Sequence, residues 1–341
     1  MKKIYIKLCY TFIMMLTIVT LCACESKNST IMPNDTSDGN RKIKIVATVF
    51  PIYDIVRNLI PDDNYELTLL LDSGIDIHNF SPTAKDIAKL AEADLFIYVG
   101  GESDNWVDKT IESSQNNSII RLNLMESLFY ITKEEEVVEG MQSEHEEHGE
   151  HEEHDGHDEH EVEMDEHIWL SVKNAKEITK VIANELMKLD DENKTIIESN
   201  ANNFIQQLDE LDRKYTEVTE KKKYDTLLFG DRFPFRYLVD DYGIDYYAAF
   251  SGCSAEAEAS FETIVFLSKK VDELGLRHVC VLEGKEPKIA ETIISSCESK
   301  DVDIVYFNSM EGITDVNDAL NTNYIKIMEG NLEAYSKALN D

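Results

Sequence analysis

The fold of this chain is indicated by a stretch near its beginning, Ile43 to Leu59, which reads IKIVATVFPIYDIVRNL. Its opening residues, up to Val49, form an apolar run that predicts a buried strand, and Ile52 to Leu59 predicts a short helix. Continuous apolar strands that alternate with helices predict a parallel sheet covered by helices. Further strand-like runs continue this alternation through the first half of the chain, at Leu67–Leu71, Leu95–Val99 and Ile119–Leu122.

The same alternation resumes in the second half of the chain. Amphipathic stretches separate the apolar runs there, and a last one, Tyr324 to Leu339, closes the sequence. We therefore expect an α/β protein with two lobes of similar size, each a mainly parallel sheet flanked by helices. The strands expected in the second lobe are Thr226–Phe229, Tyr246–Ala249, Val279–Leu282 and Ile304–Phe307.

One long helix is predicted between the lobes. Its apolar residues recur at alternating steps of four and three, which places them on one helical face. The pattern spans roughly 30 residues, or ~45 Å at the rise of an α-helix, and it contains no Gly or Pro. Such a helix would form a rigid backbone between the lobes and would limit their opening and closing. The residues of this face are Ile197, Ala201, Phe204, Leu208, Leu211, Tyr215 and Val218.

The N-terminus resembles a bacterial lipoprotein signal. A lysine-rich start precedes an apolar run from Leu8 to Val19, which is short for a membrane span. Ala23 and Cys24 follow as in a lipobox, so we expect Cys24 to carry the lipid; the alternative is an ordinary cleaved signal with a chance cysteine. The polar stretch behind Cys24 predicts a flexible tether. The expected organisation is a signal peptide at 1–23, a tether at 24–41, a first lobe at 42–173, a connecting segment with the backbone helix at 174–222 and a second lobe at 223–341.

An acidic, histidine-rich segment interrupts the first lobe. The formal net charge of the chain is -34, which argues against nucleic acid as a partner. Much of this charge lies in residues 134–166, which hold no Lys or Arg and too few apolar residues to fold, so a mobile loop is predicted. Its evenly spaced histidines are expected to bind divalent transition metals loosely, although a solvated charge run without a binding role is the alternative. These histidines are His145, His148, His151, His154, His157 and His160.

Two other histidines are placed for a fixed site. His78 lies between a predicted strand and a predicted helix, where the loops of parallel sheets line a ligand crevice, and His167 directly follows the acidic loop. Each could instead be a hydrogen-bonded structural histidine.

Few cysteines remain beyond the anchor. Cys253, Cys280 and Cys297 are odd in number, which excludes a disulfide-stapled scaffold. Cys280 lies in an apolar run and is expected to be a buried small side chain. Whether Cys253 and Cys297 pair is left open.

Several segments resemble motifs of a known family, and they do so in the same order. The chain is similar to the ZnuA-like (cluster A-I) metal-binding receptors of bacterial ABC importers from about Lys42 to its end. The resemblance implies two α/β lobes joined by a long backbone helix, no catalysis, and a metal ion held between the lobes by His78, His167 and donors of the second lobe. The segments that carry it are Phe50–Ile55 (FPIYDI), Gly74–Thr83 (GIDIHNFSPT), Ile87–Phe96 (IAKLAEADLF), Glu166–Leu170 (EHIWL) and Ser254–Ser260 (SAEAEAS).

The second-lobe donors depart from the pattern of that family. The resemblance puts Arg232 where a third ligand is usual, and because Arg cannot bind a cation, Asp231 beside it is the expected substitute. The usual fourth position falls on Asn308, and Glu283 also follows a predicted strand. Cys253 is a further thiolate candidate, although a small residue in a turn is an equally good interpretation.

The expected donor set favours zinc. Two imidazoles with one or two carboxylates suit tetrahedral Zn²⁺, whereas binding by Asp231, Glu283 and Asn308 together would favour Mn²⁺ or iron. We therefore expect a monomeric, extracytoplasmic Zn²⁺ receptor, lipid-anchored to the outer face of the cytoplasmic membrane, that delivers its ion to an ABC permease with its ATPase.

The sequence leaves three alternatives to a zinc receptor. One is a receptor for manganese or another divalent metal, and another is a surface adhesin or metal store without a transporter. The third is a zinc hydrolase, for which Glu166 beside His167 is the one candidate base. The sequence has no H-E-x-x-H helix and no Ser-His-Asp arrangement to support it.

Overall fold

The computed structural model describes residues 41–61, 64–72, 77–142, 163–254, 258–284, 286–313 and 316–341. Within this part of the chain, no helix is long and apolar enough to cross a membrane. Lys42–Asp341 forms one unit, and the following paragraphs concern that unit. The signal peptide, Cys24 and the tether up to residue 40 lie outside the described residues, as do His145, His148, His151, His154, His157 and His160.

The first sheet has four parallel strands in the order β2-β1-β3-β4. β1 is central and pairs in parallel with both β2 and β3, as the continuous apolar run at the start of the chain predicts. The strands are β1 (Ile43–Ala47), β2 (Tyr65–Leu69), β3 (Leu95–Tyr98) and β4 (Ile120–Asn123). The helices of this lobe are α2 (Phe50–Leu59), α3 (Ala84–Glu92), α4 (Val107–Ser114) and α5 (Leu124–Ser127).

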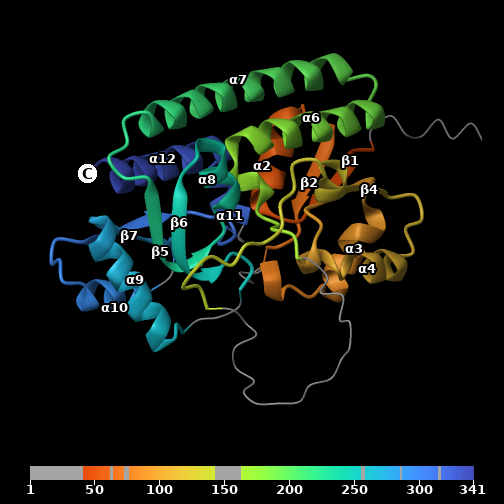
Figure 1. The fold of residues 1–341 in the computed structure, drawn as a ribbon. Coiled ribbons are helices and arrows are strands. Elements are labelled where there is room, and N and C mark those ends of the chain that lie inside the picture. The colour runs from red at the N-terminus through yellow and green to blue at the C-terminus, as the bar shows by residue number, and fades with distance from the viewer. Residues whose placement is uncertain are drawn as a thin grey trace, which may run out of the picture. The chain divides into compact units, whose positions relative to one another are not determined.

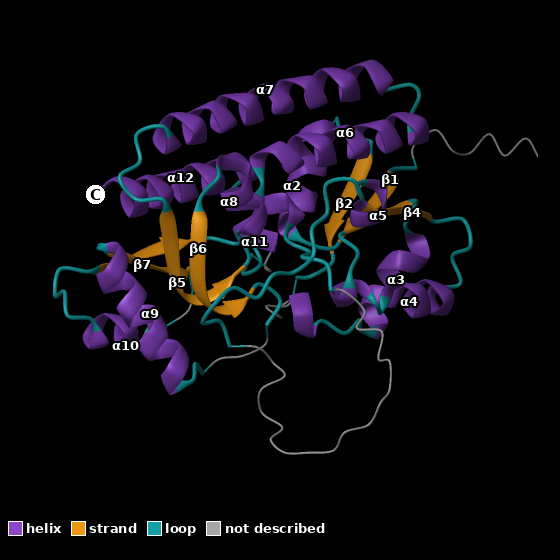
Figure 2. Ribbon diagram, viewed as in Figure 1, coloured by secondary structure: helices purple, strands orange, loops and turns teal. Residues whose placement is uncertain are grey.

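The second sheet repeats this topology with the order β6-β5-β7-β8. Figure 2 shows the strands in two separate groups, each with helices beside it, so the predicted pair of α/β lobes is confirmed. The strands are β5 (Thr226–Phe233), β6 (Asp245–Ser251), β7 (His278–Leu282) and β8 (Asp303–Phe307). The helices of this lobe are α8 (Arg236–Tyr242), α9 (Phe261–Leu274), α10 (Lys288–Ser296), α11 (Val316–Asn321) and α12 (Tyr324–Asn340).

β5 is longer than the apolar run predicts. The run stops at Phe229, but the pairing with β6 resumes after an irregularity in register and includes Arg232 and Phe233. Asp231, expected as a metal ligand, therefore lies inside a strand.

Two long helices, α6 (Val172–Leu189) and α7 (Lys194–Thr219), connect the lobes. α7 packs along α6 and also contacts α2 and α12, one helix from each lobe, and Figure 1 shows it as the long helix at the top. Asn200 donates a hydrogen bond to the carbonyl of Leu59 at 3.1 Å, and the Tyr215 hydroxyl donates one to the carbonyl of Met328 at 2.8 Å.

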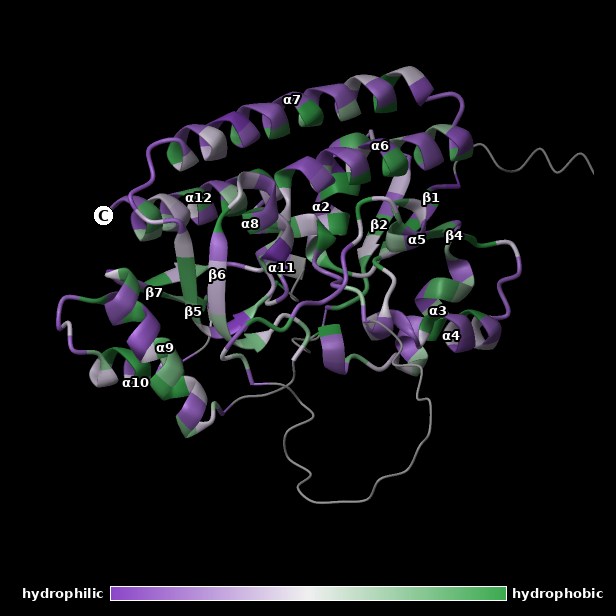
Figure 3. Cartoon of the chain, in the orientation of Figure 1, coloured by the Kyte–Doolittle hydropathy of each residue, from purple (hydrophilic) through white to green (hydrophobic). Residues whose placement is uncertain are grey.

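The predicted apolar face of α7 is the face that packs. Ile197, Ala201, Phe204, Leu208, Leu211 and Tyr215 are buried, and Val218 is partly buried against the same core. Figure 3 shows hydrophobic and hydrophilic residues alternating along this helix. The long backbone helix is therefore confirmed, whereas the limited opening inferred from it remains a prediction.

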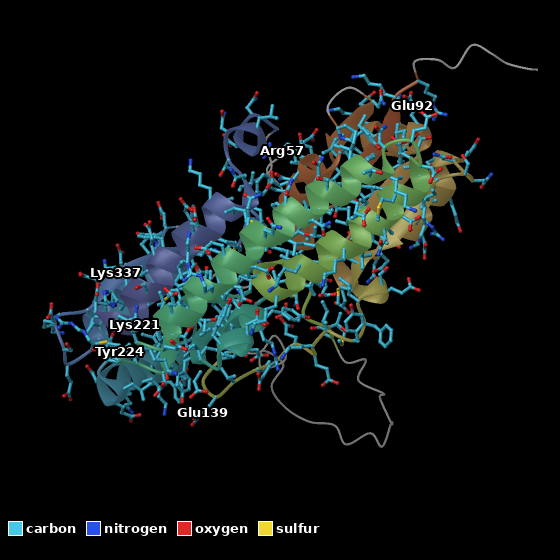
Figure 4. All side chains as sticks on the ribbon, turned by 90° about the horizontal axis from the view of Figure 1, so that it is seen from above. Arg57, Glu92, Glu139, Lys221, Tyr224 and Lys337 are labelled. Carbon is cyan, nitrogen blue, oxygen red and sulfur yellow. The ribbon has the colours of Figure 1, made fainter. Side chains whose placement is uncertain are left out.

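The lobes are also joined by direct hydrogen bonds. Arg57 of α2, labelled in Figure 4, donates to the backbone carbonyls of Ala319 and Thr322, each at 2.8 Å. From the first lobe, Nε1 of Trp169 donates to the carbonyl of Ser309 at 3.0 Å. One continuous cluster of buried apolar side chains runs through both lobes. These ties favour a small range of relative motion.

Candidate metal centre

His78 lies beyond the end of β2, in the single turn η1 (Ile77–Asn79). Its side chain is 8% exposed. Nδ1 lies 2.8 Å from Oγ of Ser103, which belongs to the turn η2 (Glu102–Asp104) after β3. Nε2 lies 3.2 Å from Oε1 of Glu311. With Nδ1 held by a hydroxyl of its own lobe, Nε2 is the nitrogen available to the other lobe.

His167 is fully buried at the start of the turn η3 (Ile168–Leu170). Oδ1 of Asp165 accepts the backbone N–H of His167 at 2.8 Å and lies 2.9 Å from its Nδ1. A carboxylate on Nδ1 keeps the proton there and leaves Nε2 for a ligand. That Nε2 lies 3.1 Å from Oε1 of Glu311. Burial alone would lower the pKa of His167, but the charges of Asp165 and Glu311 raise it to about 10.

Glu311 is the second-lobe group on which both histidines converge. Its side chain is 6% exposed, and its Oε1 is the atom that both Nε2 atoms approach. Its other oxygen accepts a hydrogen bond from Oγ of Ser309 at 2.7 Å and lies 3.9 Å from Nη2 of Arg232. Burial opposes ionisation, but the charge of His167, hydrogen bonds from both histidines and the charge of Arg232 hold the pKa of Glu311 well below its usual range. The Nε2 atoms of both histidines thus converge on one anionic oxygen of the second lobe.

A thiol lies beside the two imidazoles. Cys253 is half-buried in the turn after β6, and its Sγ and one ring nitrogen of each of His78 and His167 all lie within 4.8 Å of one another. A Cβ added at Gly252 would lie 3.1 Å from Cε1 of His167, so this turn passes directly against the imidazole. Burial, followed by the charge of Glu135, raises the pKa of the Cys253 thiol above its ordinary value.

Cys253, Cys280 and Cys297 are all free thiols, so the structure forms no bond between Cys253 and Cys297. Cys280 is fully buried in β7, as its apolar surroundings predict. The sulfur of Cys297 is also buried and hydrogen-bonds to the carbonyl of Ile293 at 3.2 Å.

A second buried carboxylate, that of Glu166, lies next to the histidines. Its Oε1 accepts the backbone N–H of Ser103 at 2.8 Å, while its Oε2 is 3.9 Å from Nδ1 of His78 and has no hydrogen-bond partner among the described residues. Gly101, at φ +84°, makes room for it, because an added Cβ would lie 2.4 Å from Oε1. Burial and the nearby Glu166 charge raise the pKa of Asp104 to about 7. Buried carboxyl groups are therefore crowded beside the two histidines, and this arrangement favours a nearby cation.

The second-lobe residues predicted as ligands have other partners. Asp231 accepts the backbone N–H of Arg232 at 2.8 Å through Oδ1 and that of Leu282 at 3.2 Å through Oδ2, which ties β5 to β7. Glu283 is exposed, and its Oε2 accepts a hydrogen bond from Nδ2 of Asn308 at 2.7 Å. Within the described ranges, the histidine–cysteine group includes neither of these carboxylates, nor that of Glu311, which contacts the two histidines by hydrogen bonds. A ligand role for the three predicted residues stays a prediction.

Sequence reasoning missed Glu311, because it took Asn308, the first polar residue after the last strand, as the donor. The available signal was an acidic side chain in the short Met310-Glu311-Gly312 turn a few residues later. Met310 adopts a left-handed backbone conformation, φ 67°. That conformation redirects the chain, and the Glu311 side chain contacts both histidines.

Solved structures share this fold. The metal-dependent lipoprotein YcdH from Bacillus subtilis matches with a TM-score of 0.68 and 25% identity, over 88% of this chain and 100% of that one. The Zn(II)-bound ZnuA-like domain of Streptococcus pneumoniae AdcA matches with a TM-score of 0.67 and 24% identity, over 88% of this chain and 100% of that one. The second likeness is one of fold alone.

Sequence relatives extend the likeness along the chain. The high-affinity zinc uptake system protein ZnuA of Bacillus subtilis (strain 168) is 30% identical over 328 residues, which is 96% of this chain and 96% of that protein. The zinc-binding lipoprotein AdcA of Streptococcus pneumoniae (strain ATCC BAA-255 / R6) is 28% identical over 314 residues, 92% of this chain but 57% of that longer protein. The family described as "zinc-uptake complex component A periplasmic" matches residues 45–338. The chain therefore belongs to this family of zinc-uptake binding components.

Proposed function

We propose that this protein captures Zn²⁺ between its two lobes and delivers it to the permease of an ABC importer. The observation that carries the proposal is the approach of Nε2 of His78 and Nε2 of His167 to one carboxylate oxygen of Glu311, at 3.2 and 3.1 Å. Membership in the family makes the chain a solute receptor and not an enzyme, as predicted.

The chemistry of these donors supports zinc. Neutral imidazole nitrogen and carboxylate oxygen are ordinary Zn²⁺ ligands in four-coordinate sites. In each histidine the second ring nitrogen is already held, by Ser103 in one and by Asp165 in the other. Such outer partners fix the ring and the tautomer in protein zinc sites. Because the two histidines and Glu311 are almost fully buried, little water screens their interaction with an ion.

Location and partners complete the proposal. The likeness to the zinc-binding lipoprotein AdcA of Streptococcus pneumoniae supports lipidation of this chain at Cys24 and anchoring to the outer face of the cytoplasmic membrane. The partners are then a membrane permease and its ATPase. The histidines of residues 134–166 would bind ions more loosely, with their capacity falling as pH drops through the imidazole pKa of about 6.5.

The test is a zinc titration of the full chain in competition with a chelator of known affinity. We expect one tight site plus weaker sites, and His78→Ala combined with His167→Ala should abolish the tight class and leave the weaker ones. The matched control is His145→Ala combined with His148→Ala, which should reduce the weak class only. Tight zinc binding that survives the first double substitution would refute the proposed site.

A further inference from the structure

The donors assigned above leave the candidate zinc site one ligand short. A protein zinc site that holds its ion without a catalytic water is almost always four-coordinate, and His78, His167 and Glu311 supply three donors. The next second-lobe side chain at this point is Arg232, which is 5% exposed and has no acceptor atom. Its Nη1 donates to the carbonyl of Ser254 at 3.2 Å, directly beside Cys253.

We propose that Cys253 is the fourth protein ligand and that it binds the ion as a thiolate. The site then presents two imidazole nitrogens, one carboxylate oxygen and one sulfur, two donors from each lobe. This inference rests on the proposed function, because it concerns the same ion. It adds the identity of the fourth donor and the class of metal that the receptor accepts.

The placement of the sulfur supports this assignment. Sγ of Cys253 and one nitrogen of each histidine lie within 4.8 Å of one another, in a group that does not include Glu311. A tetrahedral ion with bonds of ~2.0–2.3 Å would draw its ligand atoms to ~3.3–3.8 Å from one another, so the turn that carries Cys253 closes on the ion as it binds. The turn is held from both sides, since Gly252 passes against the His167 ring and the backbone N–H of Cys253 donates to Oε1 of Glu135 at 3.0 Å. The sulfur also has a hydrogen-bonding contact with the backbone of Glu166.

The unpartnered carboxylate oxygen of Glu166 is an independent sign of a cation. This oxygen is buried, lacks a hydrogen-bond partner among the described residues and lies 3.9 Å from Nδ1 of His78. A buried anionic oxygen without a partner is costly unless positive charge lies near it. With Zn²⁺ held by a thiolate, the Glu311 carboxylate and two neutral imidazoles, the charges of the ion and its ligands would balance.

A sulfur donor determines which ions the receptor accepts. Thiolate is a soft ligand that suits zinc and other borderline or soft ions, whereas Mn²⁺ prefers a site built from oxygen. The receptor should therefore discriminate against Mn²⁺ through Cys253. As the metal–sulfur bond forms, the thiol proton leaves to the solvent, since the coordinating form is the thiolate.

The test uses Co²⁺, one equivalent per full chain, as a spectroscopic probe of the site. We expect a near-ultraviolet thiolate-to-cobalt charge-transfer band, which Cys253→Ser removes while the visible band of tetrahedral cobalt remains. Cys297→Ser, a buried thiol outside the site, is the matched control and should keep the charge-transfer band. Residues 134–166 contain no cysteine, so cobalt in the acidic loop cannot produce this signal.

Selectivity provides the second readout. Cys253→Asp replaces the sulfur by an oxygen donor. It should lower the affinity for Zn²⁺ on the order of 10²-fold and reduce the ratio of the Zn²⁺ affinity to the Mn²⁺ affinity. Cobalt bound in the wild type without a charge-transfer band, or a band that persists in Cys253→Ser, would overturn the inference. The proposed function would survive that outcome if the two histidines were still required for tight binding.

Discussion

Replacing Glu311 by Gln is the substitution that probes the two-lobe site most sharply. The carboxamide keeps the shape of the side chain but removes the negative charge that both histidines approach at 3.1–3.2 Å. Structural zinc sites bind with roughly 10–16 kcal/mol spread over four ligands, or ~2.5–4 kcal/mol each. At about 1.4 kcal/mol per tenfold change, Glu311→Gln should weaken zinc binding on the order of 10²-fold. The lower end of the range applies, because the amide oxygen can still coordinate.

The same substitution should also destabilise the metal-free protein. Glu311 is 6% exposed and faces the fully buried His167. Removing one partner of a buried ion pair costs roughly 3–5 kcal/mol. The value should fall near ~3 kcal/mol here, because Asp165 remains on the other ring nitrogen of His167.

The assay pairs a chelator-competition titration with denaturant unfolding of the metal-free protein. Glu283→Gln is the matched control, since Glu283 belongs to the same lobe, its side chain is exposed, and its Oε2 accepts a hydrogen bond from Nδ2 of Asn308. It should change neither quantity. If Glu311→Gln binds zinc as tightly as the wild type, the assignment of Glu311 as a ligand is wrong.

Three further predictions concern the surroundings of the site. Ser103→Ala removes the hydroxyl that contacts Nδ1 of His78 and should weaken zinc binding by roughly 10–100-fold in the chelator-competition titration. The pKa of His167 is raised to about 10, and only a neutral imidazole binds metal, so zinc binding at pH 7 should release a proton from His167 and become tighter as pH rises. Calorimetry in buffers of different ionisation enthalpy should show this proton release as a binding enthalpy that depends on the buffer. A binding enthalpy that is the same in all buffers would contradict the prediction. Gly101→Ala should lower the melting temperature more than Gly243→Ala. Both glycines have positive φ, but of the two only Gly101 would bring an added Cβ against another residue, the Glu166 side chain. Equal losses in melting temperature would refute the close packing of Gly101 on Glu166.

Most of the fold could be predicted because both sheets are parallel and buried. Their strands are therefore continuous apolar runs, and Ile43 to Val49 is sufficient to establish the pattern. The helix α7 was predictable for a related reason, since one face of it packs while the rest is solvated. In these elements burial follows local sequence, so a one-dimensional pattern carries the information.

The end of β5 was less predictable, because tertiary contacts oppose the local pattern there. Asp231 and Arg232 are charged and resemble a loop, yet Arg232 is buried. Its guanidinium has a carbonyl acceptor at Ser254 and a carboxylate at Glu311. Ser254 and Glu311 are distant from Arg232 in the sequence, so the local pattern of apolar and polar residues does not predict these contacts.

Of the residues in the proposed site, the sequence singles out most clearly those of the first lobe. His78 and His167 stand out, because a histidine in a loop after a strand is a distinct chemical signal. Glu311 is one acidic residue among many in an acidic chain, and its role depends on the backbone turn at Met310. The thiol of Cys253 could be named as a candidate from sequence, but only the structure brings it within reach of both imidazoles.

An anomalous difference map at the zinc edge, from crystals of the zinc-loaded protein, tests the central claim most directly. We predict one strong peak between Nε2 of His78, Nε2 of His167 and Oε1 of Glu311, within bonding distance of all three. A map in which that position is empty while zinc lies elsewhere, for instance among Asp231, Glu283 and Asn308, would contradict it.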